Sequence, residues 1–399
     1  MFAGLALPIS KNRTNADFLI AFLAQALWVC IIVGYIRFLT KIPSEVFLLG
    51  LILIVCAHVF YKPQQHIILA SSSWSWPILS GLGYLILLAV LSPIAAHKGI
   101  FTEFVPRVTF MGWDGLISYN RWALEFVRFE YLPYQSYYPT GFPAAWSVIY
   151  DLQDSIDIWV FPTMMMFSLI LFPVLAFGCF VADRYWVTAS FFFLAITVLG
   201  LMEANSVTNG YMDTPVSLLL FLGLFWSLLA FTKEGSFDIR RLTTGFFLFS
   251  VAAVTKQPGL VGLGFGSVLL ISLIMKKTID YRVAAYLFVI LFTPSLFSGS
   301  IFYATGSDPL GVLQVTRTLA DENNNTIAGS LSYLISFGGI TLLCVLFVCS
   351  AWSIMRGGHA AIFSLICIII SVIGFISFHD CCSYSNRNTI WIYSFLFAA

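Results

Sequence analysis

The chain has 399 residues, of which 59% are hydrophobic and only 10% are charged. Its mean hydropathy of +0.91 excludes an ordinary soluble domain and predicts an integral membrane protein whose solvent is lipid. The formal net charge is only +1, which gives no reason to expect a nucleic-acid partner.

Apolar runs recur along almost the whole chain, and a helix needs roughly 20 apolar residues to cross a bilayer. Eleven runs are full candidates and a twelfth is incomplete: 17–37, 45–61, 77–96, 157–181, 185–202, 214–232, 242–255, 259–275, 283–303, 330–352, 360–378 and 389–399. They predict an all-α integral membrane fold with about 11–12 transmembrane helices. The sequence Lys256-Gln257-Pro258-Gly259 separates two of these runs and predicts a turn, so we expect a tight hairpin there.

The two ends of the chain carry different signals. Residues 1–16 include Lys11 and Arg13 but no short apolar core with a small-residue cleavage site, so we expect a retained signal anchor. The run 389–399 covers about half of a bilayer, so we expect the natural chain to continue beyond it.

Lys and Arg residues mark the cytoplasmic side of a membrane protein. If the chain crosses at every run, these cations share one side with the N-terminus: Lys233, Arg240, Arg241, Lys276, Lys277, Arg282 and Arg356. This predicts a cytoplasmic N-terminus and places the long loop 97–156 and the loop 379–388 outside. Arg37 and Lys41 are also placed on the external side, which is contrary to the rule that Lys and Arg mark the cytoplasmic side.

The external loop 97–156 is the longest polar part of the sequence. With a helical rotation of 100° per residue, polar and apolar side chains fall on opposite faces over residues 116–129. This pattern predicts a helix that lies along the membrane surface. Its polar face consists of Ser118, Arg121, Glu125 and Arg128. Its apolar face consists of Tyr119, Ala123, Phe126 and Val127. Asp114 stands at the expected start of this helix, where a carboxylate either caps the helix or acts as a catalytic base.

Aromatic rings and prolines fill the segment 137–146 of the same loop. Pro139 and Pro143 make it a rigid extended or turning segment. Rings such as that of Tyr138 either stack on a sugar or join the aromatic belt at the membrane interface, and the sequence leaves both open.

Three further polar residues lie at the expected mouths of spans. Asp213 precedes Thr214-Pro215 and either caps the next helix or contributes to a site. Lys256 and Arg387 suit a phosphate anion near the headgroups, although snorkelling of solvated cations is the alternative for each.

The order of these motifs resembles that of the GT-C superfamily of polytopic glycosyltransferases. The motifs are a Trp-Asp pair that opens a long external loop, an amphipathic helix, a Tyr-Pro segment, a Gly-x-x-Asp-x-Pro link, a Thr-Lys-x-x-Gly turn and a late external Arg. The branch that it resembles includes dolichyl-phosphate-mannose protein mannosyltransferases and their bacterial relatives. The resemblance covers residues 77–399, so we expect a catalytic domain there and an N-terminal transmembrane hairpin over residues 1–76.

The resemblance implies a glycosyltransferase that moves a sugar, hexosyl or pentosyl, from a polyprenyl-phosphate donor to a lipid, glycan or protein acceptor. It implies that Asp114 is the catalytic carboxylate that activates the acceptor hydroxyl. It also implies substrate-binding residues, which are Trp113, Arg121, Tyr138, Pro139, Asp213, Lys256 and Arg387. Among them, Lys256 and Arg387 would hold the donor phosphate.

The sequence departs from the family pattern in three places. Two spans precede the usual first span, and Gln257-Pro258 stands where relatives often have an acidic residue before Gly. The first loop contains no Asp-x-Asp motif, so a divalent metal or other cofactor is not expected. Six of the eight Cys lie singly inside apolar runs, so we expect packing residues and no metal site.

Two other classes of membrane protein remain as alternatives. A lipid-linked saccharide flippase or polymerase would also have external polar loops, but the loop 304–329 offers only Arg317 for a polymerase site. A secondary transporter places ionisable residues or broken helices near mid-membrane, whereas charges here are nearly absent from the span centres. We therefore expect an interfacial, multi-pass enzyme of the cell envelope, in a bacterial plasma membrane, with an active site that faces outward.

Overall fold

The computed structural model describes residues 15–47, 49–50, 77–79, 82–83, 86, 118–132, 139–153, 160–183, 185, 212–231 and 237–306. Within these ranges the backbone forms helices and turns and no β-strand, apart from one isolated bridge between Phe231 and Phe237. This confirms the all-α class for the part of the chain that is described.

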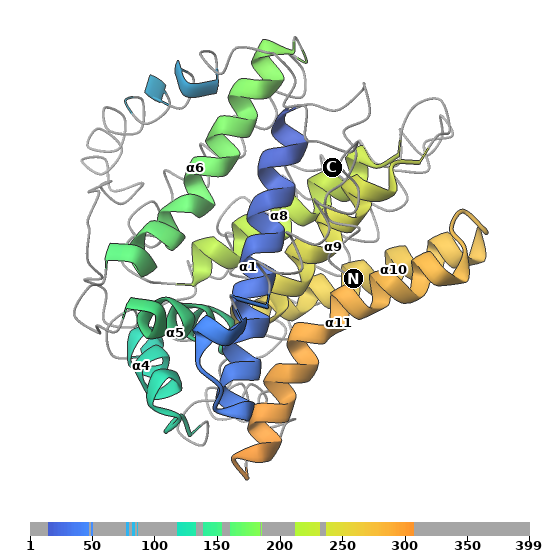
Figure 1. The fold of residues 1–399 in the computed structure, drawn as a ribbon. Coiled ribbons are helices and arrows are strands. Elements are labelled where there is room, and N and C mark those ends of the chain that lie inside the picture. Colours follow the sequence, from blue (N-terminus) through green and yellow to red (C-terminus); the bar gives the residue numbers. More distant parts are fainter. Residues whose placement is uncertain are drawn as a thin grey trace, which may run out of the picture.

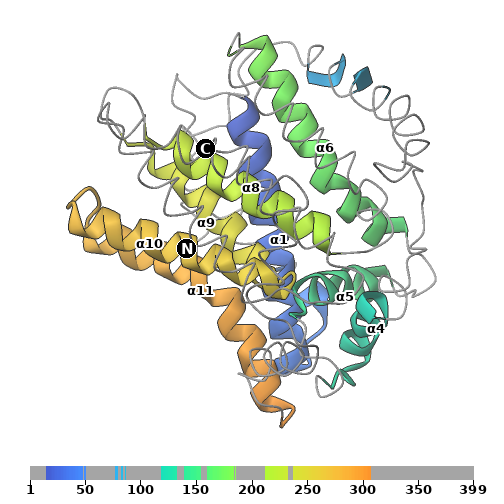
Figure 2. The ribbon, with the colours of Figure 1, turned by 180° about the vertical axis from the view of Figure 1, so that it is seen from behind.

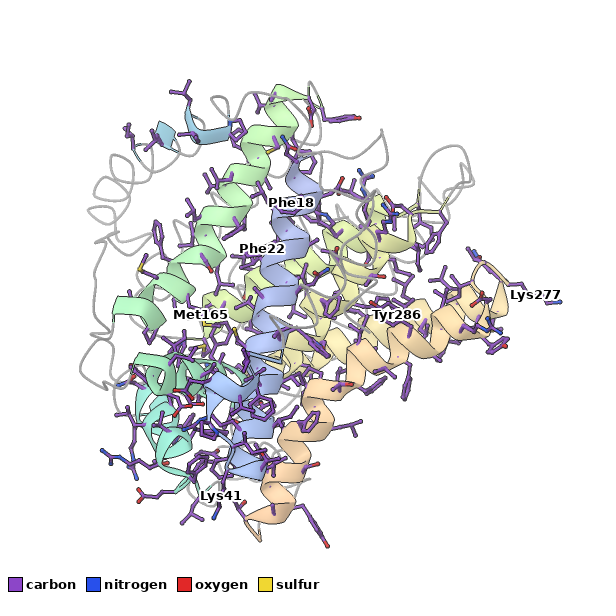
Figure 3. All side chains as sticks on the ribbon, viewed as in Figure 1. Phe18, Phe22, Lys41, Met165, Lys277 and Tyr286 are labelled. Atoms are coloured by element: carbon purple, nitrogen blue, oxygen red, sulfur yellow. The ribbon has the colours of Figure 1, made fainter. Side chains whose placement is uncertain are left out.

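Helix α1, Asn15–Thr40, lies in the middle of the described helices and packs against α5, α6, α9 and α11 (Figure 1). Between Asp17 and Arg37, near its two ends, apolar residues lie on all sides of this 26-residue helix, as in a helix that neighbours surround. Trp28 donates a hydrogen bond from its indole Nε1 to the Ile290 carbonyl at 3.2 Å, so even the middle of α1 is tied to α11. Figure 3 shows Phe18 and Phe22 on α1, and the Phe22 ring stacks on that of Phe172 in α6 at 5.8 Å.

Two short helices from the predicted loop 97–156 pack beside the end of α1. They are α4, Arg121–Arg128, and α5, Gly141–Gln153. The apolar face of α4 is buried through Trp122, Ala123 and Phe126, so an amphipathic helix is present within the predicted range 116–129. That face packs on α5 and α1, so protein covers it. The helix ends at Phe129, which is left-handed with φ 60°.

The remaining helices are α6, Val160–Ala182; α8, Asp213–Leu229; α9, Ile239–Ala253; η5, Gln257–Leu260; α10, Val261–Met275; and α11, Tyr281–Ala304. Helices α8 and α9 form a close hairpin (Figure 2). The expected turn between α9 and α10 is present and depends on Gly259, since a Cβ there would lie 1.8 Å from the Ala252 carbonyl oxygen. Carboxylates cap two helix starts: Asp238 accepts from the backbone N–H groups of Arg240 and Arg241, and Asp280 from that of Val283.

Three described helices are long and apolar enough to cross a membrane: Asn15–Thr40, Pro162–Ala182 and Tyr281–Ala304. They coincide with the predicted runs 17–37, 157–181 and 283–303. The apolar helices Pro215–Leu229 and Val261–Met275 are shorter. The predicted runs 45–61, 77–96, 185–202, 330–352, 360–378 and 389–399 lie outside the described residues, wholly or in greater part. So does the proposed boundary between residues 76 and 77.

Charged groups collect at two opposite ends of the helices. At the first, which we term the Asp17 end, the Asp17 carboxylate accepts two hydrogen bonds of 2.9 Å from the Arg241 guanidinium and one of 3.1 Å from Trp226 Nε1. This joins the starts of α1 and α9 to the end of α8. At the second, the Lys256 end, α1 and α9 end while α5, α8 and α10 begin.

Candidate active site

A backbone hydrogen bond joins two of the motifs that the sequence singles out. The N–H of Gly141, at the start of α5, donates to the carbonyl oxygen of Val254 at 2.7 Å. The approach requires glycine, because a Cβ at residue 141 would lie 2.6 Å from the same oxygen. Pro139 and Thr140, directly before Gly141, are buried. The Pro139–Gly141 segment therefore lies against the Val254–Lys256 turn.

The start of α8 also packs against this turn. Val216, in the first turn of α8, has its Cγ2 2.8 Å from where a Cβ at Gly259 would be, and the Gly259 N–H donates to the Lys256 carbonyl at 2.8 Å. The backbone of Asp213, the first residue of α8, therefore lies beside η5. Its side chain is not among those described.

Two helix N-termini, the C-terminus of α9 and Lys256 meet at this corner. The N-termini of α5 and α8, helices of 13 and 17 residues, both lie beside the turn that contains Lys256. A helix N-terminus carries a partial positive charge equivalent to roughly half an elementary charge, and a phosphate or carboxylate is stabilised there. Lys256, in the turn itself, is half-buried. The arrangement can hold a phosphate and stabilise negative charge on a leaving group.

A buried ion pair fixes α5 and α4 to the end of α1. Arg37 donates from Nε and Nη2 to the two carboxylate oxygens of Asp151, in α5, at 2.8 and 2.6 Å. Its Nη1 and Nη2 also donate to the carbonyl oxygens of Phe126 and Val127, at the end of α4, at 3.0 and 3.1 Å. The guanidinium lies 4.5 Å from the centre of the Phe129 ring.

This ion pair explains why Arg37 departs from the charge rule. Its side chain is only 3% exposed and is neutralised by Asp151, so it is a structural cation and not a topological signal. Burial alone would raise the pKa of Asp151. Hydrogen bonds from Arg37 and Ser44, with the charge of Arg37, outweigh burial and hold that pKa below its ordinary value of 3.8.

Arg121 is not brought to the turn that contains Lys256. Its side chain is 55% exposed and pairs with Glu125 within α4 at 2.7 Å. Tyr150 Oη donates to the Asn120 side-chain oxygen at 2.6 Å, which places the start of α4 beside the C-terminal half of α5. Tyr150 follows Gly141 by nine residues, so about 13 Å of helix separates this contact from the turn.

The predicted site residues thus fall into three groups. Pro139, Lys256 and the backbone of Asp213 come together, and Arg121 lies apart. The others lie outside the described residues: Trp113, Asp114, Tyr138 and Arg387. The part of the chain that is described contains no group of three His, Cys, Asp or Glu side chains that could hold a metal ion.

The structure adds residues that sequence reasoning did not select. Gly34 and Tyr35 lie inside an apolar run, where nothing local distinguishes them from packing residues. A Cβ at Gly34 would lie 2.1 Å from the Ala144 carbonyl oxygen, and the Tyr35 side chain lies near that of Thr140, so both residues adjoin the start of α5. Only a contact between distant segments could have revealed them.

No family model, curated protein or solved structure matches the chain. The resemblance to GT-C enzymes therefore rests on the order of its motifs. The function is argued below from the residues and from the geometry of the Lys256 end.

Proposed function

We propose that the protein is a multi-pass membrane glycosyltransferase that moves a sugar from a polyprenyl phosphate to a lipid, glycan or protein acceptor at the outer face of a plasma membrane. The observation that carries the proposal is the meeting of Pro139–Gly141, the start of α8 and the Val254–Gly259 turn. Pro139–Gly141 and the Val254–Gly259 turn are more than a hundred residues apart in sequence, and all three segments share one end of the helices. Each contains a motif on which the resemblance depends.

The chemistry requires two kinds of group. The acceptor hydroxyl attacks C1 of the sugar as it loses its proton to a base, the bond from C1 to the phosphate oxygen breaks, and polyprenyl phosphate leaves with inversion at C1. We assign the base to Asp114. Lys256, the N-termini of α5 and α8, and Arg387 are assigned to the phosphate, whose negative charge grows as the bond breaks.

The position of this corner suits a lipid-linked donor. It lies where α1 and α9 end. We assign this level to the membrane surface, so a prenyl chain would extend between helices while its phosphate meets Lys256. The opposite ends of α10 and α11 carry Lys276, Lys277 and Arg282, which favours a cytoplasmic location for that side. The site would then face outward.

The test is release of free polyprenyl phosphate from a panel of polyprenyl-phosphate sugars, with purified protein and membrane-extract acceptors. We expect turnover by the native chain and a loss of roughly a hundredfold to ten-thousandfold in the Asp114→Asn variant. Glu130→Gln is the matched control, because Glu130 is an exposed carboxylate of the same external loop. If folded native protein turns over no donor, the proposed function is wrong. If Asp114→Asn retains full activity, the assignment of Asp114 as the catalytic residue is wrong.

A further inference from the structure

The connection between α10 and α11, which we term the α10–α11 tip, carries three exposed cations: Lys276, Lys277 and Arg282. The tip projects from the other helices in Figures 1 and 2, and Figure 3 shows Lys277 pointing away from them. Among the described residues, none of these three cations forms an ion pair. Their charge is therefore free to attract an anionic partner.

The acidic side chains of this side of the molecule are engaged elsewhere. Asp280 is the only acidic residue between Met275 and Phe288 in the sequence, and its carboxylate accepts the Val283 N–H at 2.8 Å as the cap of α11. Arg241, by contrast, is largely buried and binds Asp17. The charge of Arg241 is thus satisfied within the fold, whereas that of the tip is not.

Exposed apolar side chains adjoin the cations of the tip. Ile274 and Met275 lie in the last turn of α10, and Tyr281 is the first residue of α11. Met275 and Tyr281 are 78% and 76% exposed. The Arg282 guanidinium lies 5.7 Å from the centre of the Tyr281 ring, and its Nε donates to the Tyr281 hydroxyl at 3.2 Å. A membrane interface accommodates cations, rings and aliphatic side chains together, because it offers headgroups and hydrocarbon side by side.

The exposed side of α11 indicates the level of the tip in a membrane. Tyr281 and Tyr303, near the two ends of α11, are both more than three-quarters exposed, and the large apolar side chains exposed between them are Phe288, Val289 and Leu296. The helix between the two tyrosines is at most about 33 Å long, against roughly 30 Å of hydrocarbon in a bilayer. Because Tyr is enriched at both membrane interfaces, Tyr281 suits the headgroup level.

We propose that the α10–α11 tip binds the anionic phospholipid headgroups of the leaflet on its side of the membrane, with its three cations on the lipid phosphates and with Met275 and Tyr281 among the lipid chains. A membrane is favoured over an acidic protein because α11, which begins at this tip, is long and apolar enough to cross a bilayer. The inference does not depend on the proposed glycosyltransferase activity, since the tip and the Lys256 turn lie at opposite ends of α10.

The experiment compares how phosphatidylglycerol and phosphatidylcholine approach the tip of the full chain in nanodiscs. With the eight native Cys replaced, a fluorophore on Thr278→Cys reports quenching by each lipid with a nitroxide near its headgroup. Each cation near an anionic surface strengthens binding about 5-fold. We therefore expect phosphatidylglycerol to quench at a mole fraction at least about 5-fold lower than phosphatidylcholine does. This preference should weaken in Lys277→Gln and vanish when Lys276, Lys277 and Arg282 are all replaced by Gln.

The matched control is Lys41→Gln. Lys41 and Lys277 are both exposed and both left-handed, with φ 58° and 53°, but Lys41 follows α1 at the opposite end of the helices. Lys41→Gln should leave the preference unchanged.

The backbone of Lys277 separates binding from stability. Glycine fits a left-handed helix end better than lysine does, so Lys277→Gly should raise the melting temperature in phosphatidylcholine and still lower the preference for phosphatidylglycerol. If Lys277 served only to stabilise the C-terminal end of α10, its substitution would change the melting temperature and leave the lipid preference as it was.

The outcomes bear on the tip alone. Equal quenching by the two lipids, as expected if an acidic protein occupies the tip, overturns the proposal, and so does a preference that survives the triple substitution. In either case the proposed function stands. Should the labelled chain fail to fold, the melting temperature of the unlabelled chain decides. Phosphatidylglycerol should stabilise the native chain relative to phosphatidylcholine, and a triple variant that keeps this stabilisation overturns the proposal.

Discussion

Arg37 and Asp151 form a two-pronged ion pair, with N to O distances of 2.6 and 2.8 Å, at the point where α1, α4 and α5 meet. Arg37 also donates hydrogen bonds to two carbonyl oxygens at the end of α4, so this one side chain of α1 links α1 to both α4 and α5. Since removal of one partner leaves a buried charge without compensation, the pair is the most sensitive polar contact in this part of the fold.

Arg37→Met should lower the free energy of unfolding by about 3 kcal/mol, because Asp151 and two carbonyl oxygens lose their donor in a largely buried setting. Thermal unfolding in nanodiscs measures the effect. The comparison is Arg121→Gln, which breaks the exposed pair with Glu125 and should cost less than about 1 kcal/mol. Equal effects of the two substitutions would show that the Arg37 contact is not stabilising.

The same pair should make stability depend on acid. The pKa of Asp151 is lowered in the folded state, so its contribution is fully present above the ordinary value of 3.8 and is lost as pH falls through the folded value. Asp151→Asn should therefore melt well below the native protein at pH 7, and the difference should shrink below about pH 4. A difference that stays constant with pH would contradict an ionised Asp151.

Asp183 should behave in the opposite way. Burial and the nearby charge of Asp17 raise the pKa of Asp183, so its protonated form is favoured in the folded state. The associated stability is present below the ordinary value and is lost as pH rises through the folded value. Asp183→Asn should thus raise the melting temperature at pH 7, and the gain should disappear in acid. A lower melting temperature at pH 7 would refute this.

Gly34→Ala should separate α5 from α1. The added Cβ would meet the Ala144 carbonyl oxygen at 2.1 Å, and such overpacking typically costs about 1–3 kcal/mol. Gly299→Ala is the matched helical control, since nothing lies within 4 Å of its added Cβ, and it should be neutral or stabilising. Thermal unfolding of both variants measures the difference, and equal melting temperatures would refute the close contact.

The sidedness of the protein can be read with cysteine labelling. Lys41 and Lys277 are both exposed and lie far apart, Lys41 after α1 and Lys277 at the tip between α10 and α11 (Figure 3). In a background in which the eight native Cys are replaced, a membrane-impermeant maleimide added to intact cells should label Lys41→Cys and spare Lys277→Cys. Labelling after lysis controls for accessibility. The reverse pattern would place the candidate site in the cytoplasm and remove the proposed function.

Several features of the fold follow from local sequence alone. Hydropathy located the spans that become α1, α6 and α11, because a membrane helix must be apolar along its whole length. Helical periodicity placed Tyr119, Ala123 and Phe126 on one face, and all three are buried. The glycine in the turn after Lys256 marked the tight connection of α9 to α10, because that backbone approach excludes a Cβ.

Tertiary structure decided the rest. Arg37 reads as an exception to the charge rule until Asp151 is found beside it, more than a hundred residues later. The N-terminal helix reads as an addition before the usual first span, yet it lies at the centre of the described helices. The sequence by itself determined which described segments are long and apolar enough to cross a membrane, because that depends on the apolar character of each segment alone. Which loops meet at the Lys256 end depends on contacts such as Gly141 with Val254, and only the packing of distant helices creates them.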